Sequence, residues 1–160
     1  MPKVISNTSP LLYLHQLGLL ELLQRLYGRV RIPPAVAHEL DEGARLGHNV
    51  PAVRDLSWIE VSEVREARVL PLATNLGAGE REAIALAVQV EDALLVLDDG
   101  LARRHAKLLR IRLTGTLGIL LRAKAKGLVQ QVAPLIDRLE DLGFRLDEDT
   151  RKAVLKLAGE

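Results

Sequence analysis

Hydrophobic runs alternate with longer helix-forming stretches along the first 115 residues. Short apolar runs predict strands at residues 3–6, 30–32, 58–61, 93–97 and 111–113. The run Ala93–Leu97 contains no polar residue, which is typical of a strand covered on both faces. Strands that alternate with helices favour a parallel sheet. We therefore predict an α/β fold in which helices cover both faces of a mainly parallel sheet.

Helix signals fill the segments between these runs. Ser9 and Pro10 provide a capping hydroxyl and a proline at the first helical position, and the helix that they start is expected to end at Gly18. Further helices are expected at residues 19–26, 34–40, 80–90, 101–109, 116–126, 129–142 and 149–157. The last two form an expected C-terminal extension, residues 129–160, on the same core. A length of 160 residues without an internal repeat or linker predicts one domain.

Composition narrows the class of protein. Hydrophobic residues make up 48% of the chain but aromatic residues only 2%, so the core must consist of Leu, Val, Ile and Ala. So few aromatics argue against RNA readers that stack several bases. The absence of cysteine excludes disulfides, zinc–cysteine sites and thiol nucleophiles. Neither a secretory signal nor an apolar stretch of ~20 residues occurs, so we expect a cytoplasmic protein without a membrane span.

Polar side chains follow three of the predicted strands. Asn7, Thr8 and Ser9 follow the first strand, Glu39 lies shortly after the second, and Asp98 and Asp99 follow the buried run. Glu80 begins the helix that leads into that run. Ligands of open α/β sheets bind beyond the carboxyl ends of the strands. Carboxylates that meet there repel one another unless a cation neutralises them, and an all-oxygen set suits Mg²⁺ or Mn²⁺.

Each of these acidic residues also has a purely structural interpretation. Asp98 and Asp99 could cap the next helix, and Glu80 could stabilise the first turn of its own helix. Glu39 could belong to a solvated acidic face, and we expect Glu82 to be a solvated surface residue. The placement of several acids at strand ends is what favours a metal site that activates water.

Five motifs in order resemble the PIN-domain family, and in particular a branch of short prokaryotic PIN-like proteins that open with V-x-S-[DN]-T-S-P. That opening is here Val4–Pro10. The resemblance continues through residues 32–36 to Glu39, residues 79–87, Asp98-Asp99 with Ala102-Arg103, and residues 115–118. It covers roughly residues 3–130, and the C-terminal helices are also of a kind seen in this branch.

The resemblance implies a three-layer α/β/α sandwich and a metal-dependent ribonuclease that uses Mg²⁺ or Mn²⁺. It also implies RNA as substrate, an antitoxin protein as a candidate partner, and a homodimer. The family's metal-binding and catalytic set is carried over onto Asn7, Glu39, Glu80 and Asp98, with Asp99 as a close alternative to Asp98. The hydroxyl of Thr8 or Ser9 would help to hold the metal or its water.

One position departs from the family pattern. Most PIN nucleases carry an acidic residue where this chain has Asn7. An amide oxygen can ligate Mg²⁺ but brings no negative charge. Two hypotheses therefore stand: an active endoribonuclease, or a catalytically weak or inactive PIN-like module that binds a protein partner or RNA.

Basic residues concentrate in one stretch of a nearly neutral chain. Residues 101–136 contain no Asp or Glu but eight Lys or Arg residues, whereas the whole chain has 22 Lys plus Arg and 21 Asp plus Glu. We expect this stretch to contact RNA phosphates, with Arg103, Arg104 and Lys107 as the preferred contacts. The alternative is a set of solvated helix faces balanced by acids such as Asp137 and Glu140.

The sequence gives no support to several other kinds of site, and it leaves the role of one surface open. The four histidines share no spacing that would build a zinc site, and no glycine motif is followed by Gly-Lys-Ser/Thr as in a phosphate-binding loop. Residues 6–9 lack the Asp-x-Asp of haloacid-type phosphatases. The leucine-rich segment Leu17–Leu26 could be a dimer face or could equally be core.

Overall fold

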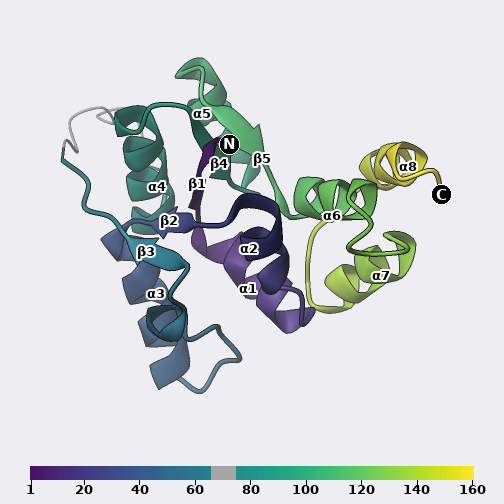
Figure 1. Ribbon diagram of the computed structural model, residues 1–160, viewed down its shortest axis with the longest axis horizontal. Coiled ribbons are helices and arrows are strands. Elements are labelled where there is room, and N and C mark those ends of the chain that lie inside the picture. The colour runs from purple at the N-terminus through teal and green to yellow at the C-terminus, as the bar shows by residue number, and fades with distance from the viewer. Residues whose placement is uncertain (66–74) are drawn as a thin grey trace.

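The protein is a five-stranded parallel sheet covered by helices, as seen in the computed structural model, which describes residues 1–65 and 75–160 (Figure 1). The strand order is β3-β2-β1-β4-β5, and every neighbouring pair is parallel. The strands are β1 (Lys3–Ser6), β2 (Val30–Ile32), β3 (Ile59–Val61), β4 (Ala93–Val96) and β5 (Arg112–Thr114).

Alternate residues of the central strands enter two separate hydrophobic cores. Val4 of β1 and Leu94 and Val96 of β4 belong to one core, and Ile5 and Leu95 belong to the other. Successive strand residues point to opposite faces, so an uninterrupted apolar run is needed wherever both faces are covered. This confirms the sequence-based interpretation of the run that starts at Ala93.

The helices divide between the two cores and complete a three-layer α/β/α sandwich. Helices α4 (Ala78–Gln89) and α5 (Gly100–Leu108) supply the core that contains Ile5. The remaining helices pack into the other core. They are α1 (Thr8–Gln16), α2 (Glu21–Tyr27), α3 (Pro34–Arg45), α6 (Thr116–Ala125), α7 (Ala133–Asp141) and α8 (Glu148–Leu157).

The expected elements are present, with ends displaced by a few residues. A short 3₁₀ helix, η1 (Val53–Asp55), was not anticipated. The C-terminal helices pack on the first core through Ile136, Leu139 and Val154. The segment Leu17–Leu26 is core, since Leu17, Leu20, Leu22, Leu23 and Leu26 are all buried. In the described parts of the chain, every helix is too short or too polar to cross a membrane.

Candidate functional site

The carboxyl ends of the two central strands bring the candidate residues together. The backbone amide of Asn7, directly after β1, donates to the carbonyl of Val96 at the end of β4 (3.0 Å). Asp98 and Asp99 follow two and three residues later. Thr8 begins α1, and its hydroxyl donates to the Glu39 carboxylate of α3. Residues that are distant in sequence therefore share one edge of the sheet.

Glu39 links α3 to the start of α4. Its second carboxylate oxygen accepts a hydrogen bond from the backbone amide of Gly79 (3.0 Å). A Cβ on residue 79 would lie 2.7 Å from both carboxylate oxygens of Glu39. The glycine therefore permits the carboxylate to reach the positive end of α4, where free amides favour negative charge.

A reciprocal contact joins the same two helices and corrects one expectation. Glu82 of α4 accepts a hydrogen bond from the backbone amide of Ala35 (3.0 Å), in the first turn of α3. The expectation that Glu82 is a solvated surface residue was wrong, because its side chain is half-buried and caps a neighbouring helix. The α3 partner of Glu82 lies 47 residues away in the chain, so no local sequence pattern predicts this contact.

Glu80 is influenced by the negative charges of two other carboxylates, those of Asp99 and Glu39. Its carboxylate accepts a hydrogen bond from the Gly77 amide (2.7 Å), closing a capping box at the start of α4. Burial raises the pKa of Glu80, the Gly77 amide opposes this shift, and the nearby charges of Asp99 and Glu39 raise the pKa further. Glu39, Glu80 and Asp99 are therefore electrostatic neighbours.

The two consecutive aspartates have different environments. Asp98 accepts hydrogen bonds from both the backbone amide (2.8 Å) and the hydroxyl (2.6 Å) of Thr116, at the start of α6. Burial raises the pKa of Asp98, while these two hydrogen bonds and the charge of Arg103 oppose the shift. Asp99 is exposed and caps α5 by accepting from the Ala102 amide (2.9 Å). Of the two, it is Asp99 whose charge raises the pKa of Glu80.

The structural interpretation, in which both aspartates cap the next helix, therefore holds for Asp99 but not for Asp98. Asp99 caps the helix that follows it, whereas Asp98 caps a helix that begins 18 residues later. A cap does not occupy every lone pair of a carboxylate, so a capping role leaves acceptor positions open on Asp99.

Asn7 supplies an unused oxygen at the centre of this edge. Its side chain is only 4% exposed, and its Oδ1 accepts no hydrogen bond from the residues that the structure describes. A buried acceptor without a partner is rare and calls for a ligand that can fill it. An amide oxygen beside carboxylates matches the hard oxygen donors that Mg²⁺ and Mn²⁺ prefer, so the donor chemistry fits such an ion.

The carboxylates are not, however, already grouped as a finished metal site. Within residues 1–65 and 75–160, no cluster of three or more Asp, Glu or His side chains could hold a metal as placed. Glu39 is engaged by Thr8 and Gly79, and Glu80 by Gly77. Metal binding would thus require these side chains to exchange hydrogen bonds for metal bonds. Ser9, the other predicted hydroxyl, is half-buried.

The basic stretch divides into paired and free residues. Lys124 pairs with Glu160 (2.9 Å), Arg112 pairs with Asp92 (3.1 Å), and Arg122 lies over the Tyr27 ring. The acids Asp137 and Glu140 both pair with Arg151 rather than with this stretch. Four basic side chains of the stretch are exposed and form no ion pair within the described residues: Arg104, Lys107, Arg110 and Lys126.

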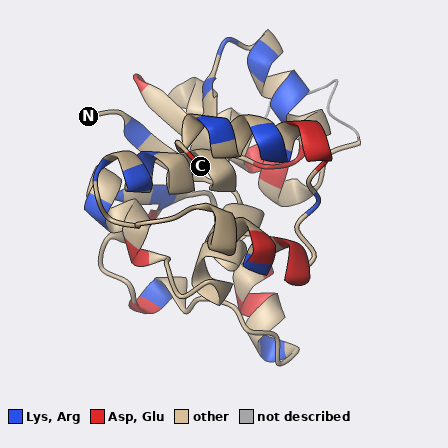
Figure 2. Ribbon diagram, turned by 90° about the vertical axis from the view of Figure 1, so that its right-hand side faces the viewer, with Lys and Arg blue, Asp and Glu red and all other residues tan. Residues whose placement is uncertain are grey.

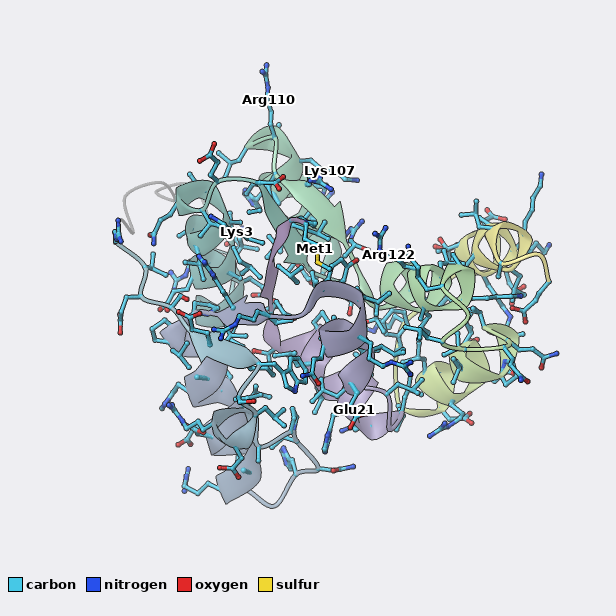
Figure 3. The ribbon with its side chains drawn as sticks, in the orientation of Figure 1. Met1, Lys3, Glu21, Lys107, Arg110 and Arg122 are labelled. Carbon is cyan, nitrogen blue, oxygen red and sulfur yellow. The ribbon has the colours of Figure 1, made fainter. Side chains whose placement is uncertain are left out.

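Most of these free charges lie on or directly after α5. Lys and Arg residues mark this helix at the top of the molecule in Figure 2. Figure 3 shows Arg110 pointing outward, away from the ribbon. Arg103, on the inner side of α5, instead donates to the Leu97 carbonyl (2.7 Å) and is half-buried. Of the predicted phosphate contacts, Arg104 and Lys107 are therefore the freer pair.

The family of the chain follows from a comparison with protein-family models. The model of DUF3368, described as a PIN domain, matches residues 3–160. The chain belongs to the PIN-domain family. No curated protein and no solved structure matches it significantly. Membership of this family indicates nuclease-type activity in general, dependence on divalent metal, and action on RNA, often under the control of an antitoxin.

Sequence reasoning missed the residues that position the PIN site. The hydrogen bonds from Thr116 to Asp98 were not foreseen, nor was the approach of Glu39 to Gly79. One signal was present in the sequence: Gly79 and Gly115 both lie in motifs that resemble the family. A Cβ at Gly115 would lie 2.6 Å from Asp98 Oδ1, just as one at Gly79 would collide with Glu39. Each glycine leaves room for a carboxylate of the site.

Proposed function

We propose that this PIN-domain protein is a metal-dependent endoribonuclease that hydrolyses RNA phosphodiesters. The observation that carries the proposal is the buried Asn7 Oδ1, which lacks a hydrogen-bond partner among the described residues at the edge that also carries Glu39, Glu80 and Asp99. Burial, and then the charges of Asp99 and Glu39, raise the pKa of Glu80. A divalent cation would satisfy both features at once, because it neutralises the carboxylates and accepts the amide oxygen as a ligand.

The proposed roles follow from the contacts of each residue. Asn7, Glu39, Glu80 and Asp99 would hold Mg²⁺ or Mn²⁺, which supplies an activated water and neutralises charge on the phosphate. Thr8 orients the Glu39 carboxylate by its hydroxyl hydrogen bond, and Ser9 is a second hydroxyl nearby. Asp98, bound by Thr116, fixes the position of the strand end that presents Asp99. The free charges of Arg104 and Lys107 would bind phosphates of the substrate.

Metal titration tests the site without relying on catalysis. At about 100 times the dissociation constant, Mn²⁺ should stabilise the fold by about 2.7 kcal/mol, which raises the melting temperature by several degrees in a domain of this size. Asp99→Asn and Glu80→Gln should abolish the shift. Asp55→Asn is the matched control, because Asp55 is exposed on η1 and away from the site.

Cleavage of a single-stranded RNA then tests the activity. We expect Mn²⁺-dependent hydrolysis that Asp99→Asn removes and Asp55→Asn retains. A parent protein that shows neither a metal-induced shift nor cleavage would refute the proposal.

A second function is favoured by one observation. Asn7 brings no charge to the site, which suits a catalytically weak or inactive module that binds RNA or a protein partner. Asn7→Asp separates the two functions. Cleavage that appears only in this variant would assign the natural protein to the binding module, whereas cleavage by both would assign it to the nucleases.

The biological setting is a further part of the proposal. We place the protein in the cytoplasm as the toxin of a toxin–antitoxin pair, supported by the frequency of such pairs in the family. Growth arrest on expression, relieved by a small protein encoded next to it, would support this role. A homodimer stays a prediction, and light scattering tests it.

A further inference from the structure

A groove of about 430 Å³ begins at Asp98, directly beside the candidate site. It starts at Asp98 and Arg103 and passes between β5 and α6 on one side and the start of α8 on the other. Asp98 is joined by a single peptide bond to Asp99, so the groove and the acidic cluster meet at this strand end. The C-terminal helices form its outer wall.

The walls of the groove combine an apolar surface with an aromatic ring. Leu113, Leu117 and Leu121 line one side, and Phe144 and Leu146 line the other. Phe144 is the single phenylalanine of the chain. The edge-to-face contact of its ring with Tyr13 (centroids 5.1 Å apart, planes at 80°) fixes its orientation. A groove with apolar side chains and one held aromatic ring can accept a single base by stacking.

The groove is lined by two carboxylates and two guanidinium groups, and only the guanidinium groups have donors free for an anionic ligand. Both carboxylates are engaged by helix starts: Asp98 by Thr116, and Asp147 by the Thr150 amide (2.7 Å). Both guanidinium groups retain free donors. Arg103 uses one nitrogen on the Leu97 carbonyl, and Arg145 is exposed and makes no hydrogen bond or ion pair within residues 1–65 and 75–160. Phosphate is the natural ligand of such a pair of arginines.

We propose that this groove binds one nucleotide of single-stranded RNA, the nucleotide next to the bond that the acidic site cleaves. Its base lies on Phe144 between the leucines, and its phosphate contacts Arg103 and Arg145. The inference rests on the proposed ribonuclease function for the identity of the ligand as RNA. It deepens that function by giving the C-terminal helices a role in substrate binding.

A binding assay without metal tests the groove separately from the chemistry. The probe is a fluorescein-labelled single-stranded RNA hexamer, and fluorescence anisotropy in EDTA reports its affinity while hydrolysis is stopped. Phe144→Leu keeps an apolar side chain but removes the flat ring, and we expect binding about tenfold weaker. Arg145→Gln should weaken binding several-fold and lower the dependence of affinity on salt concentration.

The matched control is Arg138→Gln, which removes an exposed charge on α7 outside the groove. Its affinity for the hexamer should equal that of the parent protein. Circular dichroism shows whether Phe144→Leu remains folded. If it does not, Arg145→Gln still decides the question, because Arg145 contributes no internal contact in the described residues.

The outcomes separate the groove from the acidic site. Weaker binding by both groove variants, with binding retained by Asp99→Asn, supports the nucleotide site whether or not cleavage is ever observed. Loss of cleavage in Asp99→Asn with unchanged hexamer affinity in both groove variants overturns the groove and leaves the ribonuclease standing. Unchanged hexamer affinity in Phe144→Leu and Arg145→Gln overturns the inference in the same way when no cleavage is observed.

Discussion

Asp98 and Asp99 are consecutive but have different roles, and substituting each of them gives the sharpest test of the site. Asp98 holds the start of α6 through both donors of Thr116, and Thr116 is fully buried. Asp98→Ala leaves two buried donors without their acceptor, at about 1–3 kcal/mol each. Burial disfavours the ionised form of Asp98 and so raises its pKa. Removing the carboxylate relieves this unfavourable burial, which partly offsets the loss of the two hydrogen bonds. We expect a net loss of about 3 kcal/mol in the free energy of unfolding.

Asp99 should behave differently under the same substitution. It is exposed, and its one hydrogen bond is a helix cap, so Asp99→Ala should cost about 1 kcal/mol. Asp99→Asn preserves a good cap and should be neutral within about 0.5 kcal/mol. The corresponding falls in melting temperature are about 6–12 °C for Asp98→Ala and under about 4 °C for Asp99→Ala.

Urea unfolding in EDTA measures these differences without any contribution from metal. The double variant Asp98→Ala/Thr116→Ala provides an internal check, because each single substitution breaks the same hydroxyl–carboxylate contact. Its loss should be smaller than the sum of the single losses by about 1 kcal/mol. Equal destabilisation by Asp98→Ala and Asp99→Ala, or strict additivity in the double variant, would refute the assignment of Asp98 as the structural member of the pair.

Three further predictions concern other parts of the same framework. Gly79→Ala should improve helix propensity yet displace the Glu39 carboxylate, so a melting temperature near that of the parent should accompany weaker Mn²⁺ binding in a thermal titration. The pKa of Glu80 is raised in the folded state, so the free energy of unfolding of the metal-free protein falls as pH rises. The fall begins below the ordinary pKa of a glutamate and is complete above the raised pKa of Glu80. The Mn²⁺-induced shift in melting temperature should grow over that interval in the parent and stay absent in Glu80→Gln. Glu160, whose pKa is lowered to about 2 chiefly by the amide of Val132 and the charge-assisted bond from Lys124, stabilises the fold above pH ~4.5. Glu160→Gln should therefore melt at a lower temperature at pH 7, and the difference from the parent should shrink as pH falls from about 4.5 toward 2, whereas a constant difference would contradict this account.

The local part of the fold could be read from the chain. The buried strand β4, the proline-started helix α3 and the helix-ending Gly18 all follow from rules that act over a few residues. The same rules placed Asn7, Glu39 and Asp99 near strand ends, because a parallel sheet brings those ends to one edge. The family resemblance, confirmed by the match over residues 3–160, supplied the rest of the set.

The different roles of the site residues could not be predicted from the sequence in the same way. Sequence treats Asp98 and Asp99 as near equivalents, and only the pairing of β4 with β5 brings Thr116 to Asp98 and leaves Asp99 beside Glu80. The capping of α3 by Glu82 likewise depends on how two helices pack. Hydrophobic pattern and turn chemistry act locally, so they fixed which elements form and the order in which they follow one another. Which carboxylate meets a hydroxyl, an amide or another carboxylate is decided across tens of residues, and only the packed chain brings those partners within a few ångströms.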